Sequence, residues 1–168
     1  MGWTPEPYLI GNLHKNEVIV LAGLAVAIVI GLASGKPTGS LWTRMGEEKV
    51  IRPMCNDLYD LHASDPLTKD WFPPSSSWNQ RTAAEVKENV FTFFSSGIGG
   101  PHEYKGQDMV AAHKKMAKEK PMTEAAFTAL TYHVLEKMKQ HSAGGDAEIE
   151  EVLGILMSLK PDVTKFGA

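Results

Sequence analysis

The six histidines of this 168-residue chain offer the most varied chemistry, because imidazole titrates near neutral pH and binds metal ions. His113 and His133 lie among apolar residues at helical spacing, a pattern typical of core positions. Taken alone, a histidine in such a stripe is more often a buried core residue than a metal ligand. A surface position is expected for the other four histidines, which are His14, His62, His102 and His141.

Composition narrows the classes of function. The net charge of -3 provides no basic field that would attract nucleic acid, so that class of partner is excluded. The single cysteine, Cys55, forms no disulfide within the chain and fits a reducing compartment. No cysteine and histidine cluster has zinc spacing. Metal chemistry must therefore come from histidines, carboxylates or a bound cofactor.

Helical periodicity runs through the chain after residue 40 and predicts the elements that position these side chains. No segment shows sustained alternation of apolar and polar residues, so the fold class is all-α. Pro53 is expected to bend or break the first helix, and Thr82 with Glu85 forms a capping box for the second. Helices are expected over residues 47–61, 82–94, 108–118, 123–141 and 147–159.

A run from Val18 to Gly35 contains no charged residue and predicts a single transmembrane helix. A cleaved signal peptide is one alternative, but the preceding residues lack a basic region. A buried core helix is the other, although the remaining domain has no need for a helix that is apolar on every face. The expected organisation is a tail over 1–17, a transmembrane helix over 18–35, a linker over 36–40 and a helical domain over 41–168.

Small residues recur at every fourth position of this apolar run and form one row on a helix. They are Gly23, Ala27, Gly31 and Gly35. Such a row predicts packing against a transmembrane partner helix, from a second copy or from a subunit of a membrane complex. Basic residues are more frequent after the run than before it, which places the helical domain on the cytoplasmic side, or on the matrix or stromal side in an organelle.

One motif gives His113 a more specific interpretation. Its members are Gly99, Gly100, Pro101, Tyr104, Gly106, Met109 and His113. This pattern resembles the truncated haemoglobins, in particular their first group. The segments Asn56–Tyr59, Asp65–Leu67 and Trp71–Phe72 are similar to the family in the same order, and the resemblance covers essentially everything after the linker.

The resemblance implies a truncated (2-on-2) globin fold that binds haem b, with His113 as the proximal iron ligand. It implies that Tyr59 donates a hydrogen bond to the bound gas. Val86 and Val90 occupy distal positions where the family often has a polar residue, so Tyr59 is the only distal donor unless His62 or Gln80 moves in. The remaining haem contacts that it implies are Phe72, Phe93, Met109 and Phe127.

Two functions follow from these features. The first is a membrane-anchored globin that binds O2 or NO and, given a reductase, could convert the two gases to nitrate, with no catalytic side chain assigned. The alternative is an accessory subunit of a respiratory or photosynthetic membrane complex, in which the globin-like domain is a scaffold and haem is retained or lost. Both include the lipid bilayer as a partner, and fold alone does not decide between them.

Overall fold

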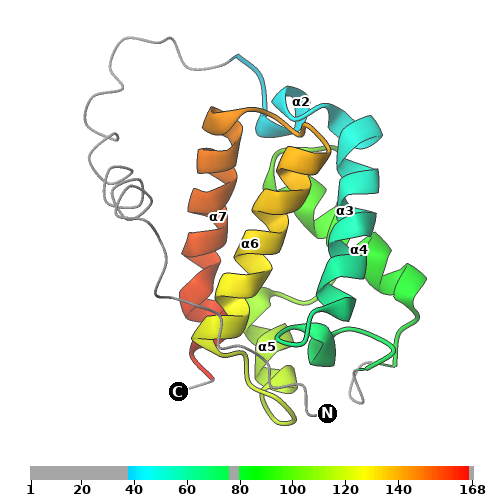
Figure 1. The fold of residues 1–168 in the computed structure, drawn as a ribbon, viewed down its shortest axis with the longest axis vertical. Coiled ribbons are helices and arrows are strands. Elements are labelled where there is room, and N and C mark those ends of the chain that lie inside the picture. The colour runs from blue at the N-terminus through cyan, green and yellow to red at the C-terminus, as the bar shows by residue number, and fades with distance from the viewer. Residues whose placement is uncertain (1–37, 76–79, 167–168) are drawn as a thin grey trace, which may run out of the picture. The chain divides into compact units, whose positions relative to one another are not determined.

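The computed structural model describes residues 38–75 and 80–166, all within the unit Thr38–Ala168 (Figure 1). Its described elements are helical, in agreement with the expected all-α class, and no strand occurs among these residues. In order they are α2 (Leu41–Arg44), α3 (Glu47–Ser64), the 3-10 helix η2 (Lys69–Trp71), α4 (Ala83–Gly97), α5 (Met109–Met116), α6 (Glu124–Gln140) and α7 (Asp146–Thr164).

Four helices, α2, α4, α5 and α6, begin at side-chain caps that satisfy backbone amides of the first turn. The predicted capping box is confirmed in α4, where the Thr82 hydroxyl accepts from the amide of Glu85 and the Glu85 carboxylate accepts from the amide of Thr82. Asp108 caps α5 and Thr123 caps α6 in the same manner. Local sequence therefore defines where these helices start.

Three helices, α3, α4 and α7, are longer than expected, and two of them, α3 and α7, run through a proline. A bend or a break was expected at Pro53, and the helix does not break there, because α3 continues to Ser64. Ile51 and Met54, on either side of this proline, are fully buried, so core packing offsets the lost backbone hydrogen bond. In α7 the helix passes residue 159 and continues through Pro161 to Thr164.

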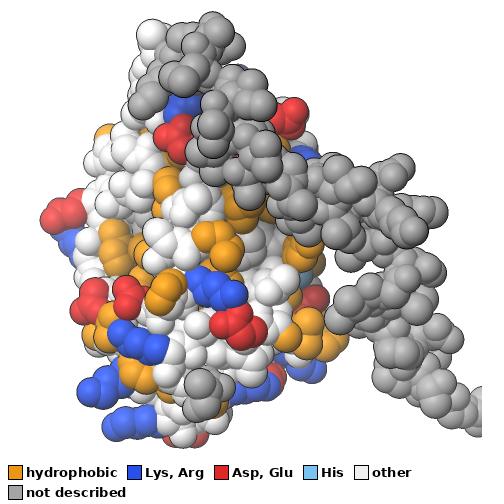
Figure 2. Space-filling view, turned by 90° about the vertical axis from the view of Figure 1, so that its left-hand side faces the viewer, with side chains coloured by type: hydrophobic (Ala, Val, Ile, Leu, Met, Phe, Trp, Pro, Cys, Tyr) orange, Lys and Arg blue, Asp and Glu red, His pale blue; other side chains and the backbone are white. Residues whose placement is uncertain are grey.

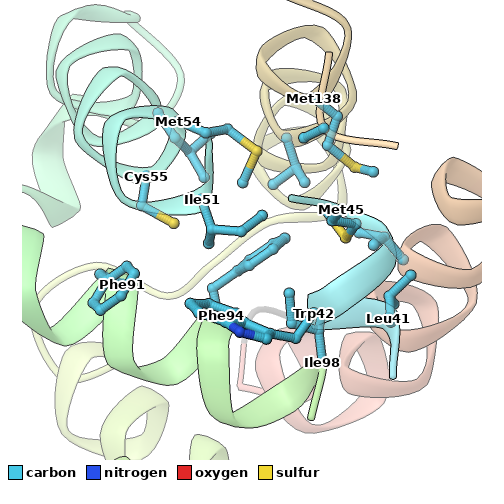
Figure 3. Packing of buried hydrophobic residues seen from close by; sticks show 14 residues of the cluster. Leu41, Trp42, Met45, Ile51, Met54, Cys55, Phe91, Phe94, Ile98 and Met138 are labelled. Carbon is cyan, nitrogen blue, oxygen red and sulfur yellow. The ribbon is translucent and has the colours of Figure 1, made fainter. Parts of the chain in front are cut away.

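The first apolar cluster holds α2, α3, α4 and α6 together (Figure 3). Met54 and Cys55 of α3 and Phe91 of α4 are 0% exposed. Trp42 comes from the four-residue helix α2, which the sequence pattern did not indicate, and its ring centroid lies 6.2 Å from that of Phe91. These contacts fix α3 and α4 relative to each other.

A second, smaller cluster lies between η2, α6 and the end of α7, with Trp71, Phe127 and Val163 among its members. Helices α6 and α7 lie side by side, and α7 also packs against α5 (Figure 1). The indole Nε1 of Trp71 donates to the backbone carbonyl of Lys120 at 3.0 Å. The short helix α5 is therefore held by its contact with α7 and by the segment that follows it.

The predicted membrane span over 18–35, with its row of Gly23, Ala27, Gly31 and Gly35, lies outside the described residues, as do the tail and the first two residues of the linker. Within the described part of the chain, no helix has the length and apolar character needed to cross a bilayer. Figure 2 looks onto the α7 side, where acidic and basic side chains alternate with small groups of apolar ones.

Candidate functional site

An apolar cavity of about 260 Å³ lies between the two clusters. Leu58 and Val134 of the first cluster and Phe127 and Val163 of the second line its wall. Its size is close to the lower end of small-molecule sites, which is about 300 Å³. The structure brings most of the predicted cofactor residues together in this wall, namely Phe72, Val90, Phe93, Met109, His113 and Phe127.

His113 lies on α5 and is oriented by a hydrogen bond within its own helix. Its Nδ1–H donates to the Met109 carbonyl oxygen at 2.7 Å, so Nδ1 carries the proton and Nε2 keeps its lone pair. Burial lowers the pKa of the ring, and the Met109 hydrogen bond opposes this only in part. A neutral imidazole fixed through one nitrogen is the usual arrangement of a histidine metal ligand.

The glycines before α5 are needed where the chain turns toward this helix. Gly99 has a φ of +79°, a conformation that favours glycine. A Cβ at Gly100 would lie 2.3 Å from the Ser95 hydroxyl and 2.7 Å from the Trp42 ring. Such a close approach excludes a side chain at this position. The connection from α4 to α5 therefore depends on the glycine pair of the motif.

Two predicted site residues, Tyr59 and Val86, are buried but are not among the residues that line the cavity. The Tyr59 hydroxyl donates to the backbone carbonyl of Pro73 at 2.7 Å. Its ring packs edge-on against Phe72, with centroids 5.8 Å apart. The predicted distal donor thus has a protein acceptor, and the Phe72 ring beside it belongs to the cavity wall.

His62 lines the cavity, and its expected surface position was wrong. The residue is 6% exposed because α6 and Phe72 cover it. The sequence contains the signal, since His62 follows Leu58 by one helical turn and Cys55 by two, and both are buried. The neighbouring Asp65-Pro66 turn suggested exposure, and the helical register was the better guide.

His62 belongs to a buried pair of imidazoles. Its ring centroid lies 5.1 Å from that of His133 on α6, and the His133 Nε2 is 3.5 Å from a carboxylate oxygen of Asp65. Burial, with a smaller contribution from His133, lowers the pKa of His62 to about 3, while the Leu130 backbone acts in the opposite direction. The ring is therefore neutral at physiological pH and has one N–H and one lone pair.

Comparisons with known proteins agree with this architecture. The sequence profile of the bacterial-like globin family matches residues 40–165. A group 1 truncated haemoglobin of Chlamydomonas moewusii is 23% identical over 124 residues, which are 74% of this chain and 67% of that protein.

Solved structures share the fold at low sequence identity. Truncated haemoglobin from Tetrahymena pyriformis, in its Fe(III) form, has a TM-score of 0.63 at 21% identity and covers 74% of this chain and 97% of its own. The 2/2 haemoglobin of Synechococcus sp. PCC 7002, solved with covalently attached haem, has a TM-score of 0.62 at 19% identity over 76% of this chain and 99% of its own. These matches concern the fold alone, and the site rests on the contacts described above.

Proposed function

The chain belongs to the bacterial-like globin family, and from this premise we propose that it binds haem b in the apolar cavity and holds a diatomic gas there, either oxygen or nitric oxide. The observation that carries the proposal is the state of His113, whose Nδ1–H is held by Met109 while its Nε2 is available to iron. An exposed or protonated ring would not support the same conclusion.

The residues around His113 fit a haem. The cavity wall is almost wholly apolar, and the aromatic side chains of Phe72, Phe93 and Phe127 provide flat surfaces for a macrocycle. When bound, haem supplies an iron atom that combines reversibly with a diatomic gas. The protein's part is to hold the iron through His113, to exclude water with this wall, and to set the polarity beside the gas.

Absorption spectra of the purified full-length chain test this proposal. We expect a Soret band that shifts when carbon monoxide is added to the reduced protein. His113→Gly should lose this band and regain it when imidazole is added, because free imidazole can replace the missing ligand. His141→Ala is the matched control, since this histidine pairs with Asp57 away from the cavity and its loss should leave the band unchanged. A full haem content in His113→Gly without imidazole would contradict the ligand assignment.

Membrane attachment is a separate part of the proposal and rests on the uncharged run from Val18 to Gly35. We expect the chain to stay in the membrane fraction after an alkaline carbonate wash, and release by that wash would contradict an anchor. Leucine at Gly23, Ala27 and Gly31 should dissociate a partner helix and reduce the particle size in detergent. An unchanged size would exclude packing through this row of small residues.

The second candidate function, an accessory subunit of a membrane complex, is favoured by the same row of small residues. The two functions differ in one observable. Protein isolated from its native membrane with a full haem content and reversible gas binding supports the gas-binding role. A haem-free chain that copurifies with a membrane complex supports the scaffold.

A further inference from the structure

Helix α7 presents to solvent a face that is uncharged along its middle, on the side that Figure 2 shows. Six exposed residues lie on this outer face at helical spacing, namely Glu150, Gly154, Met157, Ser158, Pro161 and Lys165. Only the first and the last of them carry a charge, and the Met157 side chain is 46% exposed. The solvent side of a surface helix is usually charged or polar, so the centre of this face is open to a partner.

Gly154 lies near the middle of α7, and nothing in the packing of the described chain explains it. Glycine inside a helix is less stable than alanine, so its presence there needs a reason. A Cβ at this position would have nothing within 4 Å, and the backbone is helical rather than left-handed. The close approach of a backbone from outside this chain does account for a glycine here.

The two charges of the outer face have opposite signs and stand at its two ends. The neighbouring Glu151 pairs with Arg44 of α2, whereas Glu150 has no ion pair within the described part of the chain. Lys165 is 3.2 Å from a carboxylate oxygen of Asp162 on the same helix. An exposed pair of this kind adds little stability, so Lys165 can exchange it for another carboxylate.

This arrangement of charges is self-complementary when two copies of α7 lie antiparallel. A two-fold axis between Met157 and Ser158 brings Glu150 of one copy opposite Lys165 of the other, because both residues lie equally far from the axis along the helix. The same axis places the two Ser158 side chains next to each other. A parallel arrangement would instead place like charges opposite each other.

We propose that the outer face of α7 binds a second copy of this chain in this antiparallel arrangement. The symmetry supplies two Glu150–Lys165 ion pairs, and Gly154 permits the close approach of the helices. One helix face is smaller than the about 800 Å² that each partner buries in a standard interface, so the dimer is weak and reversible. This inference goes beyond the proposed function and does not depend on haem.

Disulfide crosslinking of the full-length chain in detergent tests the packing. Oxidised Ser158→Cys should give about tenfold more disulfide-linked dimer than Ser64→Cys, because a disulfide forms only between closely spaced Cα atoms. Ser64 is the matched control, since it is also exposed but lies at the end of α3. Cys55 is 0% exposed, so the wild type should give no crosslink.

Charge reversal then tests the antiparallel arrangement. In the Ser158→Cys chain, Glu150→Lys or Lys165→Glu alone should weaken dimerisation about fivefold to tenfold, because each change places two like-charge pairs across the axis. The two changes together should restore the crosslink, because they exchange the charges and keep both ion pairs.

Equal crosslinking of Ser158→Cys and Ser64→Cys would overturn the proposal. A dimer formed only through the apolar run before residue 38, or an outer face that binds a different protein, would give this result. Charge reversals without effect, or a double variant that fails to restore the crosslink, would refute the antiparallel pairing. A chain without haem would contradict the function proposed above and leave this inference standing.

Discussion

Lowering the pH should destabilise the wild-type protein through His62, because burial lowers the pKa of this imidazole to about 3 in the folded state. In the unfolded chain the ring has its ordinary pKa of about 6.5. Between these two pKa values the unfolded state therefore binds a proton at His62 that the folded state does not bind. The free energy of unfolding should fall as the pH drops from about 6.5 toward 3, and it should be regained on return to neutral pH.

The size of this effect follows from the two pKa values. At pH 4.5 the solution is about two units below the unfolded pKa and still above the folded one, and each unit is worth about 1.36 kcal/mol. The loss between pH 7 and pH 4.5 is then about 2.5 kcal/mol. His62 is only 6% exposed, so solvent screening does little to reduce this figure. Total stabilities of domains are about 5–15 kcal/mol, which makes the effect measurable.

Urea unfolding of wild type and His62→Leu at matched haem content and at several pH values is the assay. The variant should lose about 2.5 kcal/mol less than the wild type between pH 7 and pH 4.5. The pKa values of Glu48 and Asp70 are lowered by hydrogen bonds from Arg52 and Lys120, so the stability that these carboxylates contribute is also lost in acid. This loss is the same in both proteins and cancels in the difference between their free energies of unfolding. A constant difference between the two proteins across this pH range would refute the reasoning.

Three further predictions concern the frame around the site. Phe91→Ala should lower the free energy of unfolding by about 3–5 kcal/mol, because the ring is 0% exposed; a urea midpoint near that of the wild type would contradict this. Gly100→Ala should cost about 1–3 kcal/mol in a thermal melt, because its Cβ would meet the Ser95 hydroxyl, whereas Gly97→Ala, with nothing within 4 Å, should cost nothing. Cys55, whose pKa burial raises to about 12, should react with a thiol reagent only after unfolding, and rapid labelling of the native protein would disprove its burial.

Local signals in the sequence predicted most of the fold. The cap at Thr82 and the apolar spacing of the later helices require only neighbouring residues, and the structure agrees with them. Of the bend or break expected at Pro53, the break is absent, because burial on both sides of the proline is a tertiary effect that local sequence does not show. Helix α2 has four residues, too few for a periodic pattern, and its Trp42 is held by packing on Phe91.

The site was predictable only where the motif defines it. The motif with the glycine pair resembles a known family, this resemblance implied the role of His113, and the structure places the histidine in the cavity wall. The acceptor of the Tyr59 hydroxyl was not predictable, because Pro73 lies beyond the end of the same helix and reaches it only through the fold. His62 was open to prediction from helical register, but its pairing with His133 depends on how α3 crosses α6.

The cavity's apolar character explains why one imidazole matters so much in it. In a medium of low polarity an electrostatic interaction is stronger than in water, and an unpaired polar atom costs more. With Tyr59 bound to Pro73, the polarity that a ligand meets depends on whichever remaining donor the wall supplies. His62 is neutral and packs against His133, so it adds no buried charge to the cavity wall.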